Sequence, residues 1–382
     1  MHKIQILIFL FIIFLSQSSN CTEDGLPNLM DVVQSQENGD ANDSSFFDDI
    51  KNFFKKREKK SANKISMSKN EIKKKLLLAM RESKTINFNE LIGENGKSLD
   101  LSNLTIKNVV FDGMDLSNAN FSQSILIDVH FLNVNLENGV FYEAFISRSK
   151  IENSNLNNSD FYNSSIEDTK IFKNEIIKGN FSNSTLYNVA MIENKIESTN
   201  FSHNRIIDSM VEKNKFEFNN FANLSLKNSR FMRNSVIGNN QSNNNYIDSF
   251  ILNNSFHKTN FFSSLFKNSE FNANDVSNSY IENLKLFSSA FYRNNIKNSN
   301  MNYLQMREVN GSENVFEKNL MDNADISYSV FHSADFLESR VFNFKLRNSD
   351  LSFCDFEKNT HNIKFNELYG NNIIFDGNLV KR

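Results

Sequence analysis

The chain has 382 residues, a formal net charge of −3, and an unusual composition with 65 asparagines, 38 phenylalanines, one proline and no tryptophan. The small net charge argues against a strongly charged partner for the whole chain, which makes nucleic acid an unexpected ligand. So many phenylalanines also argue against a disordered asparagine-rich chain, because disordered sequences are poor in aromatic residues. The apolar residues must therefore be placed along the chain by some rule.

Residues 1–20 are predicted to be a secretory signal peptide. The segment begins with His2 and Lys3, continues with an almost entirely apolar stretch over residues 4–15, and ends in the small polar run Ser16–Ser19. A charged end, a short apolar region and a small-residue cleavage zone are the signature of such a peptide. The apolar run is too short for a membrane-spanning helix, so we expect an exported chain without a transmembrane helix.

Cys21 follows the cleavage zone directly and is the candidate for lipid modification. Ser18-Ser19-Asn20-Cys21 resembles the relaxed lipobox of spirochaete lipoproteins, although the stricter lipobox has Leu three residues before the cysteine and Gly or Ala one before. The resemblance implies a membrane-anchored lipoprotein in the periplasm or at the cell surface rather than a freely secreted protein. Two or more acyl chains would anchor it stably. The alternative is ordinary cleavage near Ser18 or Ser19, which leaves Cys21 as a free thiol.

Two segments precede the main domain. Residues 21–45 are polar, contain the single proline and are predicted to be a flexible tether. Residues 46–98 are predicted to be a basic helical segment, with phenylalanines at helical spacing over 46–54 and a second helix over 70–83. The lysine-rich run at 55–60 has two interpretations. It contacts anionic lipid headgroups, or it is the solvated face of a cap that covers the end of the next domain, which we favour because a repeat domain needs covered ends.

A strict five-residue repeat runs from Leu101 to Phe356. The register contains 52 central positions, and 50 of them are apolar or aromatic, whereas chance at 39% hydrophobic content would fill about 20. Only Gln241 and Gly311 break the pattern. The residue two places before each centre is small or asparagine in most cases, and the residue just before it is often Asn or Asp. Neither a helix nor a strand produces this period.

The repeat resembles the pentapeptide-repeat family, whose motif is A(D/N)LXX. The best matches are Ala119-Asn120-Phe121, Ala324-Asp325-Ile326, Ala334-Asp335-Phe336 and Cys354-Asp355-Phe356. The resemblance implies an all-β solenoid over residues 99–358, a right-handed quadrilateral β-helix of about 13 coils. Each pentad would form one side of a square coil, with the central residue and the one two places before it pointing inward. Coils stacked at roughly 4.8 Å give a rod roughly 60 Å long.

A period of 20 residues predicts that like side chains stack in ladders inside the solenoid. One face would carry stacked phenylalanines, at Phe121, Phe141, Phe161, Phe181, Phe201 and Phe221. Another would carry an amide ladder bonded to the coils above and below, at Asn174, Asn194, Asn214, Asn234, Asn254, Asn274, Asn294 and Asn314. The two remaining faces carry aliphatic and serine ladders. Gln241 and Gly311 are each predicted to mark a local distortion.

The pentad register fails at His361, and a one-residue slip places Phe365 and Phe375 on a new register. We therefore predict that residues 359–382 form a C-terminal cap. The family resemblance implies that this end could also form a homodimer.

No part of the sequence predicts catalysis. The six histidines never form a close pair, and no metal, nucleotide or nucleophile motif is found. Cys354 occupies a small inward position, where it would serve core packing. We predict a protein that is not an enzyme and that has no cofactor or metal.

One surface stripe is a candidate interaction site. The residues that follow the centre on one face form an apolar stripe interrupted by Glu152, Glu212 and Asn272, and its apolar members are Leu132, Phe172, Ile192, Met232, Leu252 and Tyr292. Basic residues run beside it, at Lys173, Lys213, Arg233 and Arg293. A continuous apolar and basic band suggests a binding or dimer surface. The alternative is that exposed strand positions simply tolerate apolar residues.

The sequence therefore predicts an exported, lipid-anchored and non-enzymatic scaffold that contacts a protein partner through the sides or the C-terminal end of its rod. Some pentapeptide-repeat proteins mimic DNA and protect gyrase, but that role requires a cytoplasmic, strongly acidic rod. Residues 100–358 contain 30 acidic and 24 basic residues, and the signal peptide also argues against this role. A purely architectural spacer on the membrane is a further alternative.

Overall fold

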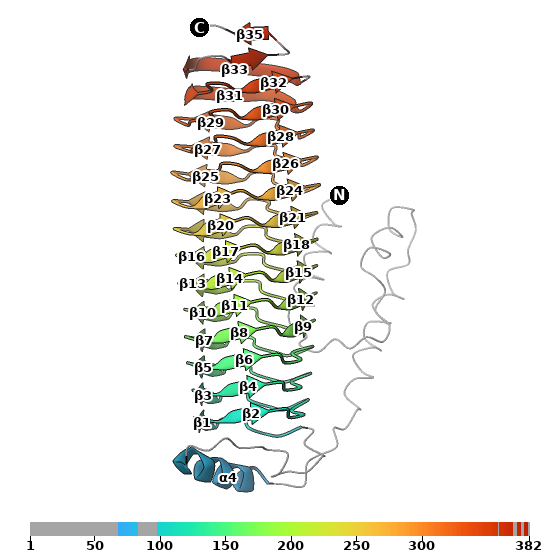
Figure 1. Cartoon of the computed structure of the whole chain (residues 1–382), viewed down its shortest axis with the longest axis vertical. Helices are drawn as coiled ribbons and strands as arrows, with labels where there is room; N and C mark the ends of the chain where they lie inside the picture. Colours follow the sequence, from blue (N-terminus) through green and yellow to red (C-terminus); the bar gives the residue numbers. More distant parts are fainter. Residues whose placement is uncertain (1–67, 83–97, 358, 370–372, 376–377, 381–382) are drawn as a thin grey trace, which may run out of the picture.

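The computed structural model describes residues 68–82, 98–357, 359–369, 373–375 and 378–380. It is a long straight rod of stacked coils, with helix α4 (Lys69–Glu82) across one end and the last strands at the other (Figure 1). The predicted signal peptide, the tether, the helix over 46–54, the lysine run and Cys21 lie outside the described residues. The predicted helix over 70–83 is confirmed to within one residue at each end.

Three sheets, parallel except for the last strand pair of the third, and one row of isolated bridges form the four sides of the rod. The first face carries β1 (Thr105–Lys107), β3 (Ile125–Ile127), β5 (Phe145–Ser147), β7 (Ser165–Glu167), β10 (Thr185–Tyr187), β13 (Arg205–Ile207), β16 (Ser225–Lys227), β19 (Asn245–Ile247), β22 (Leu265–Lys267), β25 (Lys285–Phe287), β27 (Gln305–Arg307), β29 (Asp325–Ser327), β31 (Arg340–Asp350) and β33 (Thr360–Tyr369). The second face carries β2 (Val110–Asp112), β4 (His130–Leu132), β6 (Lys150–Glu152), β8 (Lys170–Phe172), β11 (Ala190–Ile192), β14 (Met210–Glu212), β17 (Arg230–Met232), β20 (Phe250–Leu252) and β23 (Glu270–Asn272).

The third face carries β9 (Glu175–Ile177), β12 (Lys195–Glu197), β15 (Lys215–Glu217), β18 (Ser235–Ile237), β21 (Ser255–His257), β24 (Asp275–Ser277), β26 (Asn295–Lys297), β28 (Val315–Glu317), β30 (Asp335–Leu337), β32 (Asp355–Glu357), β34 (Ile373–Phe375) and β35 (Asn378–Val380). The fourth face is held by single bridges, such as Asn180↔Asn200 and Asn200↔Asn220. Neighbouring coils pair in parallel 20 residues apart along most of the rod. The predicted four-sided β solenoid is therefore confirmed.

Each pentad has a fixed inside and outside. The central residue is buried in every pentad except at Phe231, which is half-buried, and the residue two places before the centre is buried throughout. The residue two places after the centre has a positive φ in every pentad from Leu101 to Leu351. Asparagine is the commonest residue at this corner, because its side chain tolerates the left-handed conformation that most residues avoid. The corners therefore explain much of the asparagine excess that the sequence left unassigned.

The phenylalanine ladder forms as predicted. From Phe121 to Phe221, successive rings lie 4.4–5.0 Å apart between centroids, with interplanar angles of 14° or less. The same side chain at the same depth in every coil gives the interior a uniform cross-section, which suits close packing.

The asparagine ladder also forms as predicted. Oδ1 of Asn194 accepts the backbone N–H of Asn174 at 2.9 Å. Its Nδ2 donates to the carbonyl of Ile171 at 2.9 Å and to Oδ1 of Asn214 at 2.9 Å. The same bonds recur from coil to coil as far as Asn314. Each buried amide is thus satisfied by the coils on both sides, which is the condition for placing polar groups in a core.

The two breaks in the pattern do not disturb the backbone, contrary to our expectation of local distortions. The bridges Asn240↔Asn260 and Asn310↔Val330 keep the 20-residue register through both sites. Neighbouring side chains compensate for the polar group of Gln241 and for the missing side chain of Gly311. Tyr246 bonds to the buried Gln241, and the ring of Phe331 fills the level that Gly311 leaves empty.

Both ends of the rod depart from the repeat. Ser68 and Glu71 form a capping box at the start of α4, in which Ser68 N–H donates to Glu71 Oε2 at 2.8 Å. Leu76 of α4 is buried, and the helix contacts β1. At the other end, the register between β31 and β33 shifts from 20 to 19 residues after Phe342, and β34 and β35 pair antiparallel. The predicted one-residue slip is confirmed.

Candidate interaction surface

The apolar stripe lies on the second face, where its members from Leu132 to Leu252 are the last residues of strands and Tyr292 follows the isolated bridge at Ala290. Strand pairing places Phe172 beside Ile192 and Met232 beside Leu252, with Glu212 between these two pairs. Leu132 lies two coils before Phe172, on the far side of Glu152. All of the apolar members are half-buried, because each side chain is partly covered by its neighbours in the row. The structure thus brings Leu132, Phe172, Ile192, Met232 and Leu252 onto one row of the second face.

The basic residues beside the stripe lie at the positive-φ corners, but they are not a free positive band. The ammonium groups of Lys173 and Lys213 both lie 3.9 Å from the carboxylate of Glu193, one on each side of it. Arg233 lies 3.2 Å from Glu212, and Arg293 lies 2.8 Å from Glu313. The stripe is therefore bordered by ion pairs, and the prediction of an apolar and basic band is corrected to an apolar stripe with a mixed-charge border. Sequence reasoning missed the acids Glu193 and Glu313.

The ring of Phe172, a member of the stripe, contacts two lysines. The Nζ atoms of Lys170 and Lys173 lie 4.4 and 4.8 Å from the centre of its ring. Such cation–π contacts at an exposed site contribute about 0.5–1 kcal/mol each. The two lysines therefore help to hold the ring in place.

Two glutamates lie within the stripe itself. The side chains of Glu152 and Glu212 are only 17% and 14% exposed, and each has a basic neighbour, Lys150 and Arg233 respectively. Because these carboxylates are largely covered, they interrupt the apolar surface less than the sequence suggests. The region from Phe172 to Leu252 is the best-developed apolar part.

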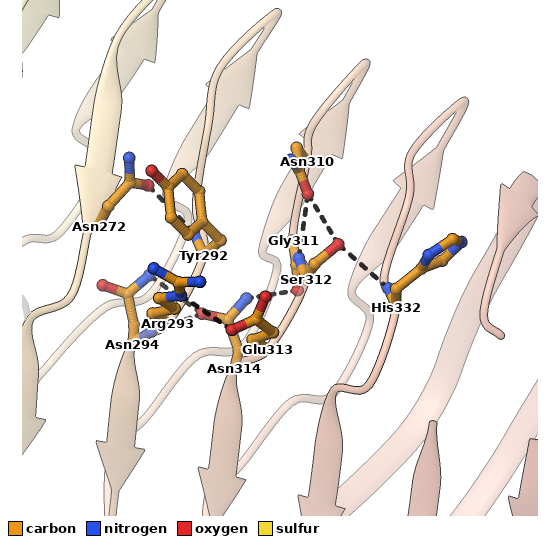
Figure 2. A network of polar contacts seen from close by, with 10 residues as sticks. All are labelled: Asn272, Tyr292, Arg293, Asn294, Asn310, Gly311, Ser312, Glu313, Asn314 and His332. Carbon is orange, nitrogen blue, oxygen red and sulfur yellow. Dashed lines mark hydrogen bonds and ion pairs between the residues drawn. The ribbon is translucent and has the colours of Figure 1, made fainter. Parts of the chain in front are cut away.

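Beyond β23 the second face becomes polar (Figure 2). Asn272 is buried, and its Oδ1 accepts the backbone N–H of Tyr292 at 3.0 Å. Ser312 N–H donates to Oδ1 of Asn310 at 3.2 Å, and His332 N–H donates to Oγ of Ser312 at 3.2 Å. In these coils, side chains form hydrogen bonds with backbone groups that bond to neighbouring strands in the preceding coils. The stripe therefore divides into an apolar part up to Leu252 and a polar part that holds Tyr292.

The fourth face carries a second row of asparagines that the predicted ladders do not include. Here the residue just before the centre caps the corner, as when Oδ1 of Asn180 accepts the N–H of Ser182 at 3.1 Å. Neighbouring coils add bonds between the amides, such as Asn220 Nδ2 to Asn200 Oδ1 at 3.2 Å. The Asn/Asp preference at this position of the motif is therefore an Asx-turn preference. This Asn/Asp preference just before the centre is the sequence signal that could have identified the row.

The row is interrupted where the rod has a surface hollow of about 460 Å³ between the third and fourth faces. Tyr280 and Leu320 replace asparagine at the capping position there, and Lys258, Asn300 and Lys318 also line the hollow. Both Tyr280 and Leu320 are exposed. A hydrogen bond to Glu282 raises the pKa of the Tyr280 phenol above its ordinary value.

The described residues hold no group of three His, Cys, Asp or Glu side chains that could bind a metal ion. Cys354 is buried, its thiol donates to the carbonyl of Phe331, and burial raises its pKa to about 12. It packs in the core, as its position in the pentad predicts. Within the same described residues, α4 is neither long nor apolar enough to cross a membrane.

Comparison with known proteins gives one family match and several solved structures of similar form. Residues 104–181 match the family model described as a pentapeptide repeat region. Trypsin-treated QnrB1 carrying R167E, a plasmid-mediated fluoroquinolone resistance protein, is 15% identical over 48% of this chain and 90% of its own, with a TM-score of 0.31. HetL, a pentapeptide-repeat protein involved in heterocyst differentiation regulation in the cyanobacterium Nostoc sp. strain PCC 7120, is 10% identical over 63% of this chain and 89% of its own, with a TM-score of 0.25.

PfbA, a surface adhesin of Streptococcus pneumoniae, is 10% identical over 83% of this chain and 90% of its own, with a TM-score of 0.26. The search of curated proteins found no match. At these identities and TM-scores, the likenesses identify no site or partner of this chain.

Proposed function

From a chain whose residues 104–181 match a pentapeptide-repeat region, and whose solenoid continues that repeat to Phe356, we propose an exported, lipid-anchored and non-enzymatic binding protein. In this proposal the rod binds a protein partner through the apolar stripe on its second face. The observation that carries the proposal is the alignment of Phe172, Ile192, Met232 and Leu252 on one side of a rigid rod.

The third face carries a more polar row than the stripe, whereas the first face also has apolar residues at this position, including the paired neighbours Tyr187 and Ile207. The equivalent positions of the third face are mostly polar, at Glu137, Asn157, Glu197, Glu217, His257, Ser277, Lys297 and Glu317, and Ile177 and Ile237 are separated there by two glutamates. An apolar row with a mixed-charge border has the anatomy of a protein interface, with an apolar centre and a polar rim. The paired charges of the rim favour a partner with complementary charges and disfavour others.

The stripe is also rigid before binding. Its residues end strands that are paired on both sides, and Phe172 is held by two lysines. A surface that is ordered in advance loses little conformational entropy when a partner docks. This favours a binding function over a purely architectural spacer, which needs no apolar row.

The stripe is tested by the triple variant Phe172→Glu, Ile192→Glu, Met232→Glu. We expect it to abolish capture of the partner, or self-association, because three carboxylates would be placed in the buried centre of the interface. The matched control is Ile177→Glu with Ile237→Glu, which introduces charge at the same pentad position on the third face. Capture that survives the triple variant, or that is lost equally in the control, would reject the stripe as the contact.

Export and anchoring rest on residues 1–20 and Cys21, whose sequence supports a signal peptide followed by an acylated cysteine. Metabolic labelling with palmitate, followed by membrane fractionation, tests this for the wild type and for Cys21→Ala. The proposal predicts label and membrane association in the wild type only. Unlabelled soluble protein from both forms would contradict it and leave the binding rod as a secreted protein.

A further inference from the structure

The outward face of α4 presents two large apolar side chains that the core does not need. Leu76 is 2% exposed and covers the first coil, whereas Leu77 and Leu78 are 46% and 56% exposed. The helix lies across the end of the rod, beyond β1 (Figure 1). One leucine is therefore used to close the solenoid, and the next two point away from it.

The same helix is basic. It contains five basic and two acidic residues in its 14-residue sequence, and Lys73 and Lys74 are exposed next to the two leucines. Glu71 is occupied at the helix start, where a hydrogen bond from the Ser68 backbone lowers its pKa. The helix is thus locally positive in a chain whose overall charge is −3.

We infer that α4 is a membrane contact that binds an anionic lipid surface. Exposed leucines beside lysines fit the boundary between headgroups and acyl chains, where the leucines enter the apolar layer and the lysines reach anionic headgroups. Charge complementarity makes an anionic bilayer the occupant of this face, rather than a neutral one. Because α4 lies across the end of the rod, the contact holds the first coil toward the bilayer and directs the C-terminal strands away from it.

This inference rests on the proposed function only for its cellular setting, since it requires no acyl chain. In that setting the two contacts have different roles. An acyl group on Cys21 would supply attachment, and α4 would fix the orientation of the rod. Lysines near an anionic surface strengthen binding electrostatically, so the helix contact is reversible and depends on salt.

The test uses the chain from residue 21 to residue 382 in the non-acylated Cys21→Ala form, which retains every described residue. Co-sedimentation is measured with phosphatidylcholine vesicles that contain or lack phosphatidylglycerol, at low and high salt. We expect binding only to the anionic vesicles, and loss of binding at high salt. Lys73→Glu with Lys74→Glu should weaken binding at least about tenfold, and Leu77→Ser with Leu78→Ser should also weaken it. The control, Lys258→Glu with Leu320→Ser on the side of the rod, should leave it unchanged.

The inference would be overturned if the protein sedimented equally with both kinds of vesicle. It would also be overturned if both α4 variants bound anionic vesicles as tightly as the wild type. Binding to duplex DNA as tight as to vesicles, with no effect of the leucine substitutions, would also overturn it, because it would show a polyanion site and no lipid contact. Binding that appears only after residues 46–67 are deleted would show that this segment of the chain covers the helix, which rejects a membrane contact in the intact protein. Palmitate labelling of the wild type separates these failures from a failure of the anchor.

Discussion

Inside the solenoid, the hydroxyl of Tyr246 donates a 2.8 Å hydrogen bond to Oε1 of Gln241. Gln241 stands in the phenylalanine ladder and Tyr246 in the aliphatic one, so two departures from the repeat meet and satisfy each other. Asn244 Nδ2 donates to the same hydroxyl at 3.1 Å. Burial raises the pKa of Tyr246 far above its ordinary value, which keeps the phenol a hydrogen-bond donor. A buried polar group is tolerated because its partner lies one pentad away.

This pairing predicts strong coupling between the two positions. Tyr246→Phe leaves Oε1 of Gln241 buried without its donor and should cost about 1–3 kcal/mol of stability. Gln241→Leu with Tyr246→Phe removes both polar groups and should cost less than the sum of the two single substitutions, with a coupling energy of about 1–2 kcal/mol. Urea unfolding of the four forms measures this. Additive effects would show that the hydrogen bond contributes nothing specific.

Gly311, the second break in the pentad pattern, predicts that an apolar residue at this central position will destabilise the protein. An apolar residue at position 311 would restore the pentad, yet a Cβ on Gly311 would lie 2.2 Å from Cε1 of Phe331. Gly311→Ala should therefore destabilise the rod by about 1–3 kcal/mol, because the ring must leave its position in a packed core. The same substitution in a Phe331→Leu background should cost clearly less. A stabilising effect of Gly311→Ala, measured by thermal unfolding, would contradict this packing.

The two asparagine rows predict different responses to the same substitution. Asn234→Ala removes the amide that accepts the Asn214 N–H at 2.8 Å and donates to the carbonyl of Val211 at 3.0 Å. Two buried groups lose their partners, so we expect a loss of about 2–4 kcal/mol. Asn240→Ala removes a surface amide whose Oδ1 accepts the backbone N–H of Ser242 at 3.2 Å. Water can accept this N–H in place of the amide. The cost of Asn240→Ala should be below about 1 kcal/mol, and equal shifts of the unfolding midpoint would refute the difference.

Burial of Cys354 predicts an unreactive thiol. Because its pKa is raised from 9.0 to about 12, the folded protein holds almost no thiolate at neutral pH. Iodoacetamide should modify the peptide that contains Cys354 only after unfolding, as measured by mass spectrometry. The raised pKa also gives a pH dependence: this group's contribution to stability is complete below pH 9 and declines as the pH rises toward 12. Rapid labelling of the native protein would show that the C-terminal coils open.

The repeat made the solenoid predictable because one physical rule, a buried residue at every fifth position, acts 52 times in the same register. The Phe121 and Asn174 ladders followed from the period of 20 alone. The compensation at Gln241 and Gly311 did not follow, because Tyr246 and Phe331 look like ordinary central residues until their rings are placed. The corner asparagines were also missed, since a positive φ leaves no trace in an apolar pattern.

The candidate surface was partly predictable for a similar reason. The row from Leu132 to Tyr292 is a direct consequence of the register, so its members could be named from the sequence. The acids beside the row could have been named as well, because the period of 20 places Glu193 between Lys173 and Lys213. The pairing of Arg233 with Glu212 could not be predicted, because it departs from that period and depends on the corner geometry of neighbouring coils. The division of the stripe at Asn272 likewise depends on a side chain that turns toward the backbone of Tyr292.

Site-specific photo-crosslinking in intact cells tests the central proposal most directly. A photoreactive residue replaces Ile192 in the apolar stripe or, as the control, Ile237 at the same pentad position on the third face. The account predicts a discrete crosslinked adduct from position 192 and none from position 237. No adduct at position 192, or the same adduct from both positions, would contradict binding through the stripe.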